Sequence, residues 1–228
     1  MHNSDACRYL LAENAFSKII IYEQRNAVGG VWNYTPLPSN KHETVNGECR
    51  QPPSQTAMDI VTTNLPKFNT PMYQGLETNL PDTLMQYSDT PFPEGTRLFP
   101  TRETVMKYLE AYAGDIMSMI RFNHQVIDVR PTSSDEWHGW AITTKPTAED
   151  ETKVEKFDAV VVANGHSDWP LLPEIDALDA WSRKYPESVH HSVSYKNPHA
   201  FKNKVSPHPA PRPHHQSNLT PFRLHPPH

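Results

Sequence analysis

Two short apolar runs, far apart in the sequence, constrain the fold more than any other feature. The first spans residues 18–23 and contains three consecutive isoleucines; the second spans residues 157–165 and contains three consecutive valines. Continuous apolar runs of this length are typical of strands that are buried on both faces, as in a parallel sheet covered by helices. We therefore predict two buried strands that belong to one α/β fold.

Helix and loop signals lie between these runs and just before them. Residues 8–14 predict the end of a helix, and residues 33–100, rich in Pro, Asn and Thr, predict loops and short turns. Thr101 is a suitable N-cap for a further helix, because its hydroxyl can accept a hydrogen bond from a free backbone N–H. The apolar stripe of that helix comprises Val105, Leu109, Tyr112, Ala113 and Ile116.

Three strand-like runs follow this helix and are separated by polar turns. They span residues 120–130, 137–145 and 153–156, and they predict an antiparallel β-meander that leads into the second buried strand. The order helix, strand, helix, meander and strand predicts an α/β nucleotide-binding domain.

Composition and charge exclude several classes of function. The formal net charge of −5 argues against nucleic acid as the main partner, because binding phosphates requires clustered Lys and Arg. There is no run of about 18 apolar residues, so no membrane span is predicted. Residues 1–7 lack the pattern of a secretory signal, and the 2 cysteines form no Cys-x-x-Cys pair. We expect a cytoplasmic protein without a metal site.

The end of the chain differs sharply in composition from the rest. Residues 206–228 contain 7 prolines, 5 histidines and no acidic residue. Proline lacks the N–H that helix interiors and strand ladders need, so this segment cannot build a core. We predict one domain over residues 1–205 and a disordered tail over residues 206–228, with metal binding by the tail histidines as the alternative.

Glu23, at the end of the first predicted strand, is the first candidate binding residue. In dinucleotide-binding folds an acidic residue at this point accepts hydrogen bonds from the ribose hydroxyls; an ordinary strand-end glutamate is the alternative. Gly29 and Gly30 follow, and without a Cβ they let the backbone approach a ligand closely. Trp32 offers a flat apolar surface to an aromatic cofactor.

This segment and several others, in the same order, resemble the flavin-containing monooxygenases, especially the fungal members. Residues 22–32 are similar to the family element Tyr-Glu-Gln-Arg-x-x-Val-Gly-Gly-Val-Trp, and residues 78–81 are similar to its Thr-Asn-x-Pro element. Residues 99–102 resemble the start of the family's next helix, and residues 160–166 resemble its strand and turn beside the flavin. The resemblance covers roughly residues 8–205.

One family fingerprint is present in altered form. Residues 185–195 keep the spacing of Phe-x-Gly-x-x-x-His-x-x-x-Tyr/Phe, but Tyr185 and Glu187 replace its first two members. His191 and Tyr195 match its last two members, and we expect His191 to be structural rather than catalytic.

The resemblance implies an oxidoreductase with two cofactors. In the family, NADPH reduces FAD, dioxygen forms a C4a-hydroperoxyflavin, and a soft nitrogen or sulfur nucleophile of a small-molecule substrate takes the distal oxygen, as in N,N-dimethylaniline monooxygenase. The resemblance implies that Asn79 is catalytic and holds the hydroperoxide or the nicotinamide, since an amide donates and accepts without adding charge. Capping of a turn before Pro81 is the alternative. Cofactor contacts are implied at Glu23, Gln24, Gly30, Val31, Trp32, Asn164 and Gly165.

The phosphate-binding loops of the family are absent from this sequence. It contains only 8 glycines against 23 prolines and has no Gly-x-Gly-x-x-Gly run, whose backbone N–H groups would hold a pyrophosphate. We therefore expect a partial FAD-binding Rossmann-like domain, truncated at both ends, which lacks the first strand and the phosphate loop and is inactive as it stands. The alternatives are a non-catalytic remnant or interaction protein, and a Baeyer–Villiger-type flavin monooxygenase, which shares the Gly-Gly-x-Trp element.

Overall fold

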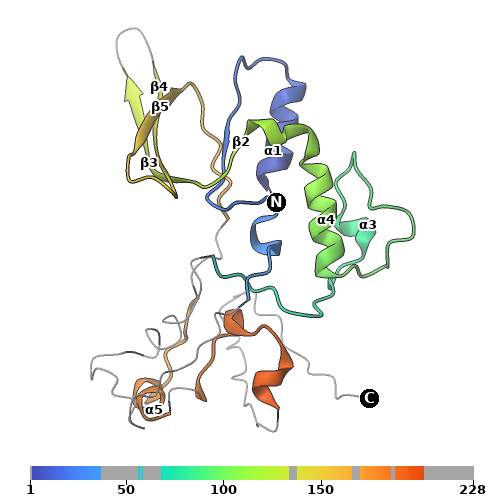
Figure 1. Ribbon diagram of the computed structural model, residues 1–228, viewed down its shortest axis with the longest axis vertical. Coiled ribbons are helices and arrows are strands. Elements are labelled where there is room, and N and C mark those ends of the chain that lie inside the picture. Colours follow the sequence, from blue (N-terminus) through green and yellow to red (C-terminus); the bar gives the residue numbers. More distant parts are fainter. Residues whose placement is uncertain are drawn as a thin grey trace. The chain divides into compact units, whose positions relative to one another are not determined.

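The structure is a computed structural model, which describes residues 2–36, 56, 58, 68–133, 138–165, 170–185 and 188–202 (Figure 1). The chain divides into two compact units, Met1–Asn197 and Pro198–His228. In the second unit the described residues form one short 3-10 helix, η5 (Pro198–Phe201). The tail predicted over residues 206–228 lies outside the described residues.

The first unit begins with helix α1 (His2–Ala12), followed by the two-residue strand β1 (Ile21–Tyr22). β1 pairs in parallel with β2 (Ile120–Arg121), so that Ile21 lies opposite Ile120. The helix and the parallel pairing confirm the α/β prediction, although the strand is shorter than residues 18–23. The prediction that it is buried on both faces is wrong, because residues 19–24 are only half-buried and, within the described residues, β1 has one ladder partner.

The second predicted strand is not formed. Residues 159–165 have no ladder partner in the described part of the chain, and the side chains of Val161 and Val162 are 58% and 74% exposed. An apolar run indicates which residues would be stable in a core, but a strand also needs a neighbouring backbone to accept its hydrogen bonds. That neighbour is missing among the described residues, so this prediction is corrected.

Helix α4 (Arg102–Tyr112) forms where the sequence predicts it. The hydroxyl of Thr101 accepts a hydrogen bond from the backbone N–H of Thr104, at 3.3 Å, and thereby caps the helix. The 3-10 helix η2 (Gly114–Met119) continues it. The predicted apolar stripe is confirmed, and Tyr108 is a further buried member. The buried residues of α4 and η2 are Val105, Tyr108, Leu109, Tyr112 and Ile116.

The meander is confirmed as a three-stranded antiparallel sheet in the order β3-β4-β5. Its strands are β3 (His124–Ser133), β4 (His138–Pro146) and β5 (Lys153–Phe157). Side chains join this sheet to the short parallel pair. The Tyr22 hydroxyl donates to Glu155 Oε2 at 2.6 Å, and Arg121 forms an ion pair with the same carboxylate. These bonds lower the pKa of Glu155, the hydrogen bond from Tyr22 most of all.

Two hydrophobic clusters make up the core of the first unit. One lies around α4 and contains Phe92, Val105, Tyr108 and Leu109, with Trp32, Met85 and Tyr87 packed against it. The other contains Cys7, Ala113 and Ile116, with Ile19, Ile21, Val28 and Met119 packed against it, so it joins α1, β1 and η2. The remaining described elements are short: η1 (Gly30–Trp32), α3 (Asp82–Met85), α5 (Leu178–Lys184) and η4 (Ser192–Ser194). No helix in the described ranges has the length and apolar character needed to cross a bilayer.

Candidate functional site

The loop that follows β1 contains most of the predicted cofactor-binding residues. Glu23 begins it, and its backbone N–H donates to Arg121 O at 3.1 Å while its carbonyl accepts from His124 N at 3.0 Å. One oxygen of the Glu23 carboxylate, Oε1, accepts from the backbone N–H of Arg25 at 2.8 Å. Within the described residues the other oxygen has no hydrogen-bond partner, so the half-buried carboxylate is oriented and keeps one acceptor free for a ligand hydroxyl.

A glycine turn follows, with positive φ angles of 98° at Gly29 and 52° at Gly30. A Cβ placed on Gly29 would lie 2.6 Å from Met106 Sδ and 2.7 Å from Met106 Cε. The space that Gly29 leaves open is therefore filled by a side chain of α4. This corrects the expectation that Gly29 admits a ligand: its lack of a Cβ serves the packing of the loop on α4.

Trp32 and Asn33 fix the end of the loop. Trp32 packs against the cluster around α4, which makes it partly buried. The Asn33 amide donates to Val28 O at 2.7 Å and to Gly30 O at 3.1 Å, closing the turn. Thr70, which is almost fully buried, donates from its hydroxyl to Asn33 O at 2.6 Å. The loop is thus held in one conformation before any ligand binds, which lowers the entropic cost of binding.

Lys196 supports Thr70 from the opposite end of the unit's sequence. Its ammonium donates to the backbone carbonyls of Thr70 and Met72, the latter at 3.3 Å, and the residue is only 4% exposed. Burial away from water disfavours the charged form and lowers the pKa of Lys196 to about 8. Sequence analysis did not single out Asn33, Thr70 or Lys196; only Asn33, a residue type common in turns and three positions after Gly30, carries a recognisable turn signal.

Lys196 makes the stability of the chain depend on pH. The pKa of Lys196 in the folded state, about 8, lies below the value of 10.5 for a lysine in water, so between these two pH values the unfolded chain binds more protons. We expect the free energy of unfolding to rise with pH from about 7 to 9.5, by on the order of 1–2 kcal/mol. Urea unfolding across this range measures the rise. Lys196→Met should flatten it and the exposed Lys107→Met should not; an equal slope in all three proteins would refute this assignment.

Asn79 lies in a different loop, whose backbone is well anchored. The Thr78 N–H donates to Pro100 O at 3.0 Å, and the Thr78 hydroxyl donates to Leu80 O at 2.8 Å. Asn79 itself is exposed, and in the described part of the chain its side chain has no hydrogen-bond partner. Its amide does not cap the turn before Pro81, since α3 has Pro81 at its N-cap position and no side-chain cap.

Of the other predicted residues, Gln24 and Val31 lie on the loop after β1, whereas Asn164 and Gly165 follow β5. Asn164 and Gly165 are exposed, Gly165 has a φ of 76°, and the neighbouring His166 lies outside the described residues. Val31 is exposed and Gln24 is half-buried. The structure therefore brings together the candidates on the loop after β1. Among the described residues, no hydrogen bond, ion pair or ring contact joins Asn79, Asn164 or Gly165 to them.

His191 has a structural role, as expected. Its Nδ1 accepts from the backbone N–H of Val193 at 3.1 Å and so caps η4. Burial lowers the pKa of His191. The aromatic ring of Tyr195 meets that of Tyr73 edge-on, with the centroids 5.3 Å apart.

The residues of the loop after β1 fit one part of an FAD molecule. The free oxygen of Glu23 can accept a hydrogen bond from a ribose hydroxyl, and Trp32 offers apolar surface. The given sequence contains no Gly-x-Gly-x-x-Gly run, the element whose backbone N–H groups hold a pyrophosphate in dinucleotide-binding folds. Within the described residues, the groups that fit are therefore an acceptor for a sugar hydroxyl and an apolar surface.

Sequence comparison finds that known proteins are similar to this chain. A family model described as "Flavin-binding monooxygenase-like" matches residues 61–206. The "Flavin-containing monooxygenase FMO GS-OX5" of Arabidopsis thaliana is 33% identical over 210 residues, which is 88% of this chain and 40% of that protein. The "Flavin-containing monooxygenase FMO GS-OX-like 9" of the same plant is 32% identical over 201 residues, 82% of this chain and 39% of that protein. The chain thus spans about 40% of the length of these relatives.

A solved structure is also similar, but distantly. "Ornithine Hydroxylase (PvdA) from Pseudomonas aeruginosa" aligns with a TM-score of 0.34 and 22% identity, over 43% of this chain and 23% of that one. This likeness is too weak to carry an argument.

Proposed function

The chain belongs to the flavin-binding monooxygenase-like family, and on this premise we propose that the loop over residues 23–32 is part of the FAD site of an NADPH-using monooxygenase. The observation that carries the proposal is the Glu23 carboxylate, oriented by the Arg25 N–H with one oxygen left to accept. The buried support from Thr70 and Asn33 favours the same role, because it holds the loop in place without using its outer surface.

In this proposal each residue has a limited task. Glu23 binds the ribose through its free oxygen, and Gln24, Gly30 and Val31 line the same loop. Trp32 excludes water from the apolar part of the cofactor, and Asn79 presents a neutral amide that donates and accepts at the reacting end. Bound FAD would supply the redox chemistry with dioxygen, and NADPH would supply the electrons. Asn164 and Gly165 would line the cofactor cleft more loosely.

The proposed substrates are small molecules with a soft nitrogen or sulfur nucleophile. This rests on the segment Thr78-Asn79-x-Pro81, which is similar to the element of the monooxygenases with that preference. For the 228-residue polypeptide by itself we propose weak FAD binding and no turnover, because it has no Gly-x-Gly-x-x-Gly loop to hold the pyrophosphate. The domain over residues 1–205, followed by a tail over residues 206–228, remains part of this proposal.

Titration of the purified chain with FAD tests the proposal. We expect weak, submillimolar binding, and Glu23→Gln should loosen it by about tenfold, because it removes a charge-assisted hydrogen bond. Glu13→Gln, at an exposed glutamate of the preceding turn, is the matched control and should bind as the unaltered chain does. Equilibrium dialysis at millimolar FAD measures all three proteins.

Two results would count against the proposal. Equal FAD affinity in Glu23→Gln and Glu13→Gln would show that the carboxylate does not face the ribose. Tight stoichiometric FAD with substrate-dependent NADPH oxidation would refute the statement that the 228-residue polypeptide is inactive.

A further inference from the structure

A stack of aromatic rings connects the loop before Pro91 with helix α4. The rings of Tyr87 and Tyr112 lie almost parallel, at 17°, with their centroids 3.9 Å apart. Phe92 stacks on Tyr108 in the same way, with the centroids at 3.9 Å and the planes at 19°. Trp32 packs against this cluster from the loop after β1. Rings at such short separations are coupled closely enough for an electron to pass between them.

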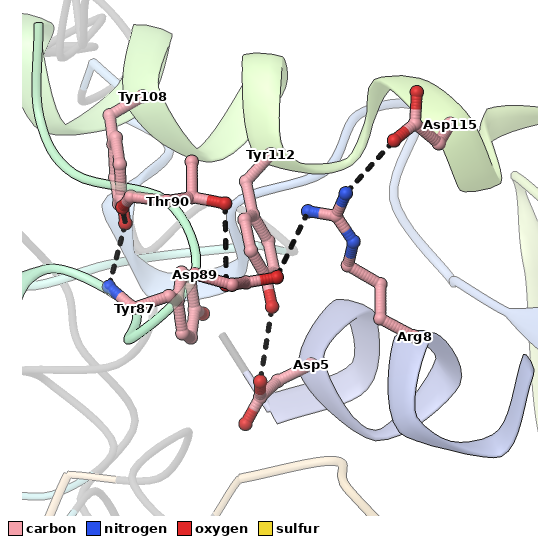
Figure 2. A network of polar contacts seen from close by, with 8 residues as sticks. All are labelled: Asp5, Arg8, Tyr87, Asp89, Thr90, Tyr108, Tyr112 and Asp115. Atoms are coloured by element: carbon pink, nitrogen blue, oxygen red, sulfur yellow. Dashed lines mark hydrogen bonds and ion pairs between the residues drawn. The ribbon is translucent and has the colours of Figure 1, made fainter. Parts of the chain in front are cut away.

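The hydroxyl of Tyr112 differs from that of Tyr108 in the group that accepts its proton (Figure 2). Tyr112 donates to a carboxylate oxygen, Asp5 Oδ1 on α1, at 3.1 Å. Tyr108 donates to a backbone carbonyl, Thr90 O, at 2.6 Å. A carboxylate can take up a proton at neutral pH, whereas a backbone carbonyl cannot. Tyr112 alone of this pair therefore has a base in place for its phenolic proton.

A guanidinium and three carboxylates lie around Tyr112. The Arg8 guanidinium lies 4.5 Å from the centre of the Tyr112 ring and pairs with Asp115 at 2.9 Å and with Asp89 at 4.0 Å. These two carboxylates offset the positive charge beside the ring, and Asp5 is the carboxylate that contacts Tyr112 itself (Figure 2). The negative charge of Asp5 favours the loss of an electron and a proton from the phenol that it contacts. Burial and the bond to Asp5 also raise the pKa of Tyr112, so the phenol keeps its proton at neutral pH.

We propose that Tyr112 is a redox-active tyrosine that is oxidised by one electron while Asp5 takes its proton. The O–H bond of Tyr112 breaks, its electron goes to a one-electron oxidant, and its proton forms an O–H bond on Asp5 Oδ1. The products are a neutral phenoxyl radical, a protonated Asp5 and the reduced oxidant. Tyr87, stacked on Tyr112, relays the electron from Tyr112 toward an oxidant at the surface of the cluster.

The aromatic cluster around Tyr112 lies next to the proposed FAD loop. Trp32 lies on the proposed FAD loop and packs against the cluster that contains Tyr108. An oxygen-derived radical that removes an electron at that loop can therefore draw an electron from the buried tyrosines through this cluster. Only this choice of natural oxidant rests on the proposed function. The transfer of an electron and a proton from Tyr112 does not depend on the proposed function, so it can be tested without flavin.

Photo-oxidation of the purified chain tests the proposal. Excited ruthenium tris-bipyridine with persulfate supplies a one-electron oxidant, and freezing within seconds is followed by electron paramagnetic resonance. We expect a persistent tyrosyl radical, because the burial of Tyr112 protects it from water and from coupling with other chains. Tyr112→Phe keeps the stacked ring and should remove most of this signal, whereas Tyr9→Phe, at a residue that is 63% exposed, should leave it unchanged.

The role of Asp5 has its own pair of variants. Asp5→Asn can still accept the hydrogen bond but is no base, so the radical yield should fall by about tenfold or more. Asp5→Glu restores a carboxylate and should recover the yield. Circular dichroism of each variant checks that it is folded. A persistent signal that survives in Tyr112→Phe would overturn the assignment to Tyr112, and an undiminished yield in folded Asp5→Asn would overturn the role of Asp5.

Discussion

Replacement of Ile116 by alanine is expected to lower the free energy of unfolding by about 2–5 kcal/mol. Ile116 is fully buried, at 0% exposure, and belongs to the cluster in which Cys7 of α1 and Ile21 of β1 pack together. Removing its outer carbons loses apolar burial and leaves a cavity, because the surrounding main chain is held by two helices and a strand. Since this cluster joins α1 to β1, the loss of stability should affect the unfolding of both elements together.

Urea unfolding followed by circular dichroism measures this effect. Leu84→Ala is the control, because Leu84 lies on α3 and is 72% exposed; its change should stay within about 0.5 kcal/mol. If Ile116→Ala costs no more than Leu84→Ala, the cluster around Ile116 does not form as described.

Gly29→Ala is expected to be the second large change, with a loss of about 2–4 kcal/mol. Part of it is conformational: at φ 98° a residue with a Cβ costs about 1–2 kcal/mol. The rest is steric, because the new methyl group would lie within 2.7 Å of the sulfur and the methyl of Met106. Either the end of the Met106 side chain or the loop after β1 must shift, and a shift of the loop should weaken FAD binding.

Gly95 offers a matched comparison for this change. Its φ of 82° is similarly left-handed, but a Cβ there would meet nothing within 4 Å. Gly95→Ala should therefore cost only the conformational part, about 1–2 kcal/mol. In a Met106→Ala background the cost of Gly29→Ala should fall toward the same value. Equal losses for the two glycine variants in the unaltered background would contradict the close packing of the loop on Met106.

The parts of the fold that were predictable from the sequence are those fixed by local signals. Thr101 indicates where α4 starts, and the apolar stripe indicates which face of α4 is buried. The meander consists of neighbouring strands joined by polar turns. In both cases the partners lie close together in the sequence, so periodicity and turn residues are sufficient to place them.

The strand partners of the two apolar runs could not be predicted from local signals. The runs at residues 18–23 and 157–165 look alike in sequence. Within the described residues the first forms a parallel ladder with β2, whereas the second is paired only at Phe157, the last residue of β5. Composition predicts that such a run prefers a core but does not identify the backbone that pairs with it. The supports of the candidate site are similarly non-local: Lys196 reaches Thr70 over 126 positions, and no local pattern marks either residue.

For the candidate site, the sequence predicted that several candidate residues follow one another on the loop after β1, and their roles in binding stay predictions. Glu23 is placed at the end of a strand as expected, and Gly30 and Trp32 follow on the same turn. Gly29, however, makes room for Met106, which no motif indicates. Asn79 is predicted as a member of a motif, but no motif indicates that its side chain is exposed and has no hydrogen-bond partner among the described residues.

Hydrogen–deuterium exchange of the chain during the FAD titration tests the central claim most directly, because it locates the contact. We predict that FAD slows the exchange of the backbone N–H groups over residues 23–33 and leaves β4 unchanged. The Glu23→Gln variant should show the same pattern only at higher FAD concentration. Unchanged exchange over residues 23–33 at an FAD concentration that saturates binding, or slowing confined to the meander, would contradict the claim that this loop is part of the FAD site.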